Sequence, residues 1–149
     1  MQDPDRQRIV VGIDGSEGSL VALRVAATEA RLRGVPLEVL CAWHPGMSGS
    51  LPGFGVGTPV ADALDELSTA LTATLEAEGL GAGGDLTVTA TVVAAHAAES
   101  LIDASENAAL VVVGSRGHGG FAGMILGSVS QHVTTHARCP VMIVPLSTP

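Results

Sequence analysis

The chain has 149 residues, 46% of them hydrophobic, so it is long enough to bury one core, and we expect a single domain over residues 1–149. Its formal net charge of −8 and its aromatic content of 2% argue against nucleic acid and anionic membranes as partners. The two cysteines are too few for a disulfide scaffold. Because no signal peptide or apolar run of about 18 residues is evident, we expect a cytoplasmic protein.

The N-terminal part predicts a strand, a helix and a second strand. After a tail over residues 1–7, the almost wholly apolar run 8–14 is typical of a strand buried on both faces. Ser16 is placed to cap a helix that Gly34 ends. Residues 37–43 predict the second strand. The apolar residues of the helix that we expect to share one face are Leu20, Val21, Leu23, Val25 and Ala27.

A Gly-, Pro- and Ser-rich segment over residues 44–59 comes next, and it predicts a flexible loop. It is either a surface connection or a lid over a ligand. The helix predicted over residues 60–78 ends at Gly79 and carries leucines at helical spacing, at positions 64, 67, 71 and 75.

The second half of the chain continues the alternation of strands and helices. Residues 87–92 alternate polar and apolar side chains, which indicates an edge strand with one wet face. A helix over 97–107 leads to the apolar strand 110–113 at the sheet centre. A helix over 128–138 precedes the last strand, 141–144, and its predicted buried residues are Val129, Val133 and Ala137.

This alternation predicts a Rossmann-like α/β fold with five parallel strands and helices on both faces of the sheet. With the Thr-rich third strand at one edge, the strand order is 3-2-1-4-5. The direction of winding then switches between the first and fourth strands, where such sheets bind ligands. Asp14 is expected to end the first of these strands and Gly114 the fourth.

The segment from Gly114 to Ser128 follows a buried strand and opens a helix. Its glycines allow close approach of the backbone to a ligand, and a helix start at Gly127 and Ser128 presents backbone N–H groups to an anion. No Asp or Glu lies between Asn107 and Pro149, so no carboxylate of this segment repels a phosphate. A flexible glycine-rich turn is the alternative reading.

Two nucleotide motifs can be set aside. A Walker P-loop needs a lysine, and the chain has none. The stretch from Gly117 to Ala122 satisfies the loose pattern G-x-G-x-x-A, but it follows the fourth strand, and no acidic residue lies downstream to hold a ribose. The dinucleotide reading is therefore disfavoured.

The spacing Gly114-x2-Gly117-x9-Gly127-Ser128 resembles the ATP-binding signature of the universal stress protein family, G-x2-G-x9-G-[ST]. The resemblance extends to the opening IVVGIDGSEGS and to the ending LGSVSQHVTTHARCPVMIVP. It implies an adenine nucleotide alpha hydrolase-like fold, an ATP-binding protein of stress response, and a homodimer through the strand Val141–Val144, an apolar edge that would otherwise invite pairing.

The resemblance also implies roles for individual residues. Asp14 would contact the ribose or a divalent ion such as Mg²⁺, and Ala42 would border the adenine through its backbone. Ribose and phosphates would lie against Gly114 and Gly117, and Gly127 and Ser128 would hold the phosphate chain. Arg116 and His118, within the same loop, either meet phosphate or point to solvent. Asp14 also has a purely structural alternative, as an acid at a helix N-terminus.

Two further features bear on function. The chain has Ala95-His96-Ala97 where the family often has a Gly-x-Pro turn, which leaves the local geometry and any role for His96 open. His132 and His136 share a helix face but have no apparent third ligand, which favours solvated histidines over zinc.

The chain offers no well-placed general base. We therefore expect a regulatory ATP-binding module. The alternative is a slow ATPase or phosphotransferase that uses Asp14 and Mg²⁺, and a partner-binding domain without a ligand is a weaker third reading.

Overall fold

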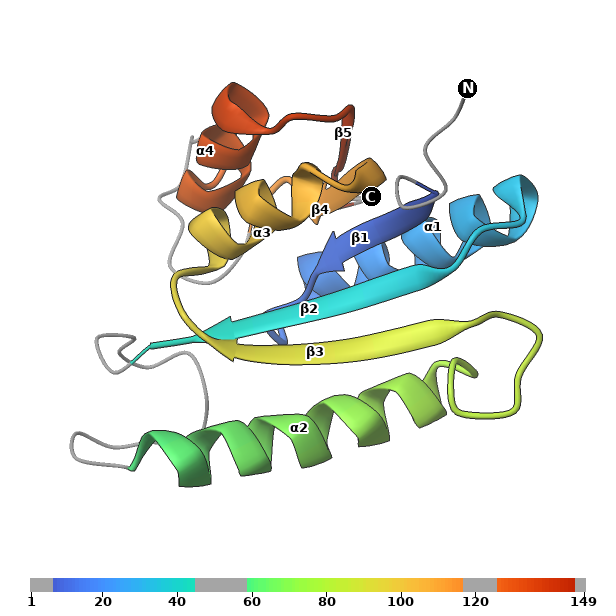
Figure 1. Ribbon diagram of the computed structural model, residues 1–149, viewed down its shortest axis with the longest axis vertical. Helices are drawn as coiled ribbons and strands as arrows, with labels where there is room; N and C mark the ends of the chain where they lie inside the picture. Colours follow the sequence, from blue (N-terminus) through green and yellow to red (C-terminus); the bar gives the residue numbers. More distant parts are fainter. Residues whose placement is uncertain (1–6, 45–58, 117–125, 147–149) are drawn as a thin grey trace.

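One parallel sheet organises the structure (Figure 1). The computed structural model describes residues 7–44, 59–116 and 126–146, and in these ranges five strands pair in the order β3-β2-β1-β4-β5. The predicted class and strand order are confirmed. The elements are β1 (Arg8–Gly12), α1 (Glu17–Arg33), β2 (Leu37–Trp43), α2 (Val60–Ala77), β3 (Val88–Ala94), α3 (Ala97–Ser105), β4 (Ala108–Gly114), α4 (Ser128–His136) and β5 (Val141–Val144).

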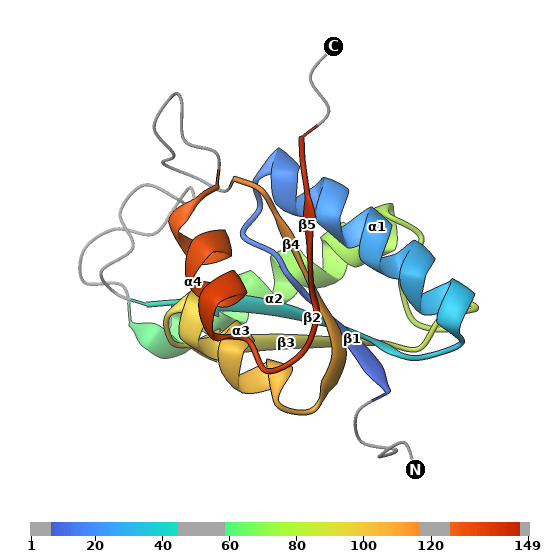
Figure 2. The same cartoon turned by 90° about the horizontal axis from the view of Figure 1, so that it is seen from above.

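The central strands β1 and β4 are buried on both faces. Val11 of β1 lies opposite Val39 of β2 and Val112 of β4 in the core on one face, and Val10 lies opposite Val111 of β4 in the core on the other, all without exposed surface. Helices therefore have to cover both sides of the sheet, as the continuous apolar runs predict. Helices α1 and α2 pack on one face, and α3 and α4 pack together on the other (Figure 2).

Helix α1 lies against the sheet through small side chains. Ala22, Ala26 and Ala30 have no exposed surface, whereas the predicted face residues Leu20, Val21 and Val25 are only partly buried. The predicted face was therefore wrong in part. Alanine makes the difference, because its small side chain lets the helix backbone approach the strands closely. Gly34 ends the helix in the left-handed conformation at φ +66°, as predicted.

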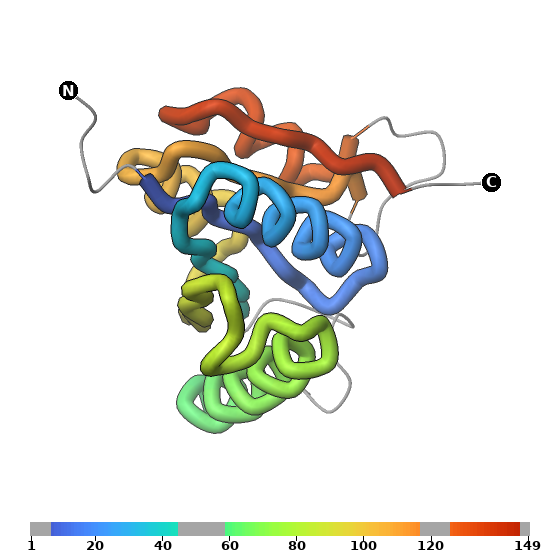
Figure 3. Tube along the Cα trace, turned by 90° about the vertical axis from the view of Figure 1, so that its right-hand side faces the viewer, coloured from blue at the N-terminus to red at the C-terminus, as the bar shows by residue number. Residues whose placement is uncertain are grey.

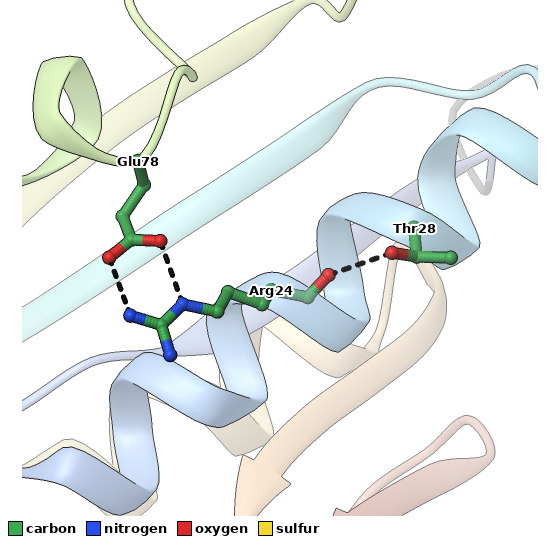
Figure 4. Close-up of polar contacts among 3 residues, drawn as sticks. All are labelled: Arg24, Thr28 and Glu78. Atoms are coloured by element: carbon green, nitrogen blue, oxygen red, sulfur yellow. Dashed lines mark hydrogen bonds and ion pairs between the residues drawn. The ribbon is translucent and has the colours of Figure 1, made fainter.

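The two helices on this face are linked by an ion pair at the surface (Figure 4). The Arg24 guanidinium of α1 donates to both carboxylate oxygens of Glu78, the residue after α2, over 2.8 and 2.9 Å. In the same way, Arg31 donates to Asp85 over 2.9 and 3.3 Å. Because three of the four side chains are more than 40% exposed, these pairs orient the connection between α2 and β3 more than they stabilise it.

The two edges of the sheet differ in cover (Figure 3). Strand β3 lies at one edge and packs against α2, which confirms its predicted edge position. The predicted alternation of a wet and a dry face is wrong in part, because Thr89 and Ala90 are both exposed. Strand β5 forms the other edge. Three of its four residues are only partly buried, although all four are apolar. An apolar edge strand of this kind invites pairing with another chain.

Some predicted boundaries and faces were wrong. Strand β1 ends at Gly12 and not at Asp14, because the chain turns toward α1 at Gly15. In α4 the buried residues are Ser130 and Val133, whereas Val129 is 37% exposed. The apolar pattern misled here, because a serine occupies an inward position. No helix in the described part of the chain is long and apolar enough to span a membrane.

Candidate functional site

Hydrogen bonds of the Asp14, Ser16 and Ser19 side chains hold the junction between β1 and α1 together. Asp14 Oδ1 accepts hydrogen bonds from the Ser16 amide over 2.9 Å and from the Ser16 hydroxyl over 2.5 Å. The Ser16 hydroxyl in turn accepts from the Ser19 amide over 3.2 Å, which caps α1 as predicted. Gly15, at φ +84°, makes the turn between them possible. The first turn of α1 thus obtains its cap from its own sequence.

Asp14 also acts on the neighbouring strand. Burial raises the pKa of the Cys41 thiol in β2 to about 11, and the negative charge of Asp14 contributes to the shift in the same direction. Cys41 is 7% exposed, so its thiol stays protonated at neutral pH.

Ala42 lies at the end of β2, beside this junction. The Ile13 amide donates to the Leu40 carbonyl over 3.0 Å, which continues the pairing of the two strands beyond Gly12. Asp14 and Ala42 therefore lie at neighbouring positions where the adjacent strands β1 and β2 end. The side chain of Ala42 is buried on the α3/α4 face, so only backbone groups of this residue could meet a base.

The junction between β4 and α4 is built differently. The Gly127 amide donates to the Ser115 carbonyl over 2.7 Å, and the Ser115 amide donates to the Val144 carbonyl over 2.9 Å. These bonds bring the two ends of the glycine-rich segment together next to β5. The buried Ser130 hydroxyl donates to the Gly114 carbonyl over 2.6 Å and so ties α4 to the end of β4.

Helix α4 starts without a side-chain cap. Its N-cap is Gly127, whose amide is already bonded to Ser115, so this N–H is not among the unpaired groups that the sequence predicted. The next three amides, from Ser128 to Ser130, have no acceptor within the helix. Ser128 itself is exposed at the first helical position. This end of α4 is suited to an anion because of its amides and its dipole.

A tight contact joins the two junctions. A Cβ atom on Gly18 would lie 2.6 Å from the Arg116 carbonyl oxygen, and one on Gly114 would lie 2.9 Å from the Gly18 carbonyl oxygen. Both distances are shorter than real Cβ contacts, and the opposing atoms belong to the backbone. Glycine at 114 is therefore required by the packing of α1, whatever else this residue does.

Most of the predicted site residues gather at one place. Asp14, Ala42 and Gly114 lie at the ends of β1, β2 and β4, respectively, and Gly127 and Ser128 begin α4 beside them. The side chain of Arg116 is exposed. Gly117 and His118 lie outside the described residues. Among the residues that the structure describes, no group of three or more His, Cys, Asp or Glu could hold a metal ion.

Sequence reasoning missed the residues that hold these turns together, namely Gly18, Ser19 and Ser130. Small residues in the first turn of each helix were the available signal, but small size alone does not reveal which backbone they approach. The turn with the unusual Ala95-His96-Ala97 starts α3 normally. His96 is its N-cap residue, and the His96 carbonyl accepts from the Ser100 amide over 3.0 Å.

Comparison with known proteins places this geometry in a family. The model of the universal stress protein family matches residues 5–145. A universal stress protein of Mycobacterium tuberculosis (strain ATCC 25618 / H37Rv) is 37% identical over 143 residues, which cover 96% of this chain and 46% of that protein. The chain thus spans about half the length of the curated relatives it matches.

Solved structures agree. A universal stress protein in complex with cAMP has a TM-score of 0.62 at 27% identity and covers 95% of this chain and 98% of its own. A universal stress protein from Archaeoglobus fulgidus in complex with dAMP has a TM-score of 0.61, also at 27% identity, over 93% and 97%. On the match of its family model and its curated relatives, the chain belongs to the universal stress protein family.

Proposed function

We propose that the chain binds ATP at the switch point between β1 and β4, with the phosphates on the segment from Gly114 to Ser128. The observation that carries this proposal is the N-terminus of α4, which has no side-chain cap and three first-turn amides without an intrahelical acceptor. Relatives solved with cAMP and dAMP support an adenine nucleotide.

In this proposal the base borders the backbone of Ala42, and the ribose lies near Asp14. Its carboxylate, whose Oδ1 atom accepts from the Ser16 amide and hydroxyl, offers the oxygen ligands that a ribose hydroxyl or a Mg²⁺ ion binds. Since Mg²⁺ is usually held by one or two carboxylates together with substrate phosphates, a single Asp14 is an adequate donor set for it.

The phosphates would lie beside Gly114 and Gly117 and on the start of α4 at Ser128, with Gly127 fixing the turn through its bond to Ser115. Arg116 and His118 are further candidates for phosphate contact. The acid-free stretch from Asn107 to the end of the chain keeps repulsion low in this part of a protein whose net charge is −8.

We infer a regulatory role for ATP rather than rapid turnover. Asp14 follows β1, and its Oδ1 atom already accepts hydrogen bonds from the Ser16 amide and hydroxyl. Slow hydrolysis or phosphotransfer with Asp14 and Mg²⁺ is the second candidate. ATP that persists through purification would support the module, and repeated release of ADP would support the enzyme.

The decisive experiment is to identify by mass the nucleotide that the freshly purified chain carries. The Gly117→Val variant should lose the nucleotide, because a branched side chain blocks approach of the backbone to the phosphates. Ser128→Ala should weaken binding, and exposed Thr69→Ala on α2 is a control that should leave it unchanged. Undiminished binding by Gly117→Val would contradict the proposed site.

We also propose a homodimer through β5. The strand is an apolar edge that is only partly buried within the chain, and pairing with a second copy would cover it. Sedimentation at micromolar concentration should give a dimer. Met142→Lys, which places a charge in this strand, should shift the chain to the monomer, and a wild-type chain that sediments only as a monomer would contradict the proposal.

A further inference from the structure

Helix α4 carries a pair of chemically active groups that begins one turn after Ser128. His132 and His136 are four residues apart, so they lie one above the other on the same helix face. Both side chains are exposed, their ring centroids are 4.7 Å apart, and the ring planes are inclined by 44°. Two imidazoles held in this way on a rigid element can bind one metal ion together.

The separation of the rings identifies the geometry of such an ion. With a metal–nitrogen distance of about 2.1 Å, the metal lies about 3.2 Å from each ring centroid. If the ion lies in line with one nitrogen of each ring, centroids 4.7 Å apart subtend an angle of about 90° at it. Square-planar and octahedral ions require this angle, whereas a tetrahedral zinc site requires a wider one.

The surroundings of the pair favour a cation. His136 is the last residue of α4, where the partial negative charge of the helix dipole lies. Arg138 is the next cationic residue in the chain, and its guanidinium forms an ion pair with Glu106 over 3.2 Å. In the part of the chain that the structure describes, no third His, Cys, Asp or Glu completes a closed site, so water would fill the other coordination positions.

We propose that His132 and His136 form a two-histidine site for a divalent cation of the Ni²⁺ and Cu²⁺ class. The sequence alone favoured solvated histidines because the usual closed zinc site needs more ligands. The ring separation changes this assessment, because it fits an open bidentate site for a different metal. The proposal does not rest on the function proposed above.

A second histidine pair offers a matched control. The rings of His44 and His96 are closer, with centroids 4.0 Å apart, which corresponds to an angle of about 75° at a shared metal. This angle is too narrow for either preferred geometry. We therefore expect the same metal to bind at His132 and His136 and not at His44 and His96.

The test is calorimetric titration of the untagged full chain with Ni²⁺, which unlike Cu²⁺ leaves thiols unoxidised. We expect one Ni²⁺ ion per chain. His132→Gln and His136→Gln should each weaken binding at least about tenfold, because each removes half of a chelate. The double variant should bind little more weakly than either single variant, and His96→Gln should bind as the wild type does.

Thermal unfolding gives a second readout. Excess Ni²⁺ should raise the Tm of the wild-type chain and of His96→Gln, and it should leave the Tm of His136→Gln unchanged. Because both His132 and His136 are exposed and glutamine suits a helix, the variants should fold without metal as the wild type does. Unchanged Ni²⁺ affinity in either single variant, or a clear preference for Zn²⁺ over Ni²⁺, would overturn the proposal.

Discussion

Two strand-to-helix junctions lie side by side at the carboxyl edge of the sheet, and they treat the helix N-terminus in opposite ways. At the β1–α1 junction, Ser16 caps the helix and Asp14 accepts from Ser16. At the β4–α4 junction, Gly127 provides no side-chain cap. The comparison teaches that a capped helix uses a first-turn N–H group within its own chain, whereas an uncapped helix does not. We therefore place the proposed anion site at α4 and not at α1.

The largest expected effect comes from the contact that joins the junctions. Gly18→Ala should destabilise the chain by about 2 kcal/mol, because the added methyl group meets the Arg116 carbonyl oxygen at 2.6 Å. Gly114→Ala should act in the same direction through the Gly18 carbonyl. Urea unfolding measures both effects.

Gly81→Ala is the matched control, because its methyl group would meet the side chain of Glu76 at 3.2 Å, and that side chain can move. Helix propensity alone predicts that alanine in place of Gly18 stabilises α1. A Gly18→Ala variant as stable as the wild type would therefore show that the two junctions are not in tight contact.

The next effect separates the capped junction from the uncapped one. Ser16→Ala should cost about 1 kcal/mol of stability, because it removes the cap of α1 and a donor to Asp14. Ser128→Ala removes no cap and should change stability by less than about 0.5 kcal/mol. Chemical denaturation of the two variants in parallel tests the contrast. Equal losses at both positions would remove the distinction between the junctions.

A comparable loss, of about 1 kcal/mol, is expected where α4 is tied to β4. Ser130→Ala deletes a buried hydroxyl that donates to the Gly114 carbonyl over 2.6 Å. Ser100→Ala is the control, because its hydroxyl bonds the His96 carbonyl over 2.9 Å at an exposed site. If both variants unfold at the same urea concentration, the bond to Gly114 does not hold α4 in place.

The last prediction concerns pH and the charge at the β1–α1 junction, and its effect on stability is absent at neutral pH. The pKa of Cys41 is raised from 9.0 to about 11, so the protonated thiol contributes stability that is complete below pH 9 and is lost as the pH rises through 11. The stability advantage of the wild type over Cys41→Ala should shrink across this range. The measurement is urea unfolding of both chains at several pH values.

Asp14→Asn should lower the pKa of Cys41 slightly, because the negative charge is the lesser of the two causes of the shift. Titration of the thiolate by its ultraviolet absorbance would show this, with the Cys41→Ala variant subtracted as the background. A Cys41 pKa that is unchanged in Asp14→Asn would mean that the carboxylate lies farther from β2.

The apolar pattern predicted the fold well, for a physical reason. Runs such as residues 110–113 exclude water on both faces, so they belong in the centre of a parallel sheet, and the Thr-rich run at β3 belongs at its edge. The inward face of each helix was harder to predict. Ser130 is buried and Val129 is exposed, because the position of α4 is set by a hydrogen bond to Gly114 and not by hydrophobicity alone.

The sequence predicted where the candidate site lies better than it predicted the hydrogen bonds within the site. The positions of Asp14, Ala42 and Gly114 follow from the strand order, and the structure brings them to one edge. Their assigned roles, together with those of Gly117 and His118, stay predictions, as do the dimer and the cytoplasmic location. The hydrogen bond from the Gly127 amide to the Ser115 carbonyl could not be predicted from the sequence, because a bond between backbone groups does not depend on residue type.

By itself, the sequence determined the class of fold, the order of the strands and the family, because apolar periodicity and glycine spacing are local properties of the chain. Only the tertiary structure decided which helix keeps its first-turn amides for a ligand and why residues 18 and 114 must be glycine. Both depend on backbones that are far apart in the chain and meet only after folding, at distances of 2.6 and 2.9 Å for an added Cβ atom.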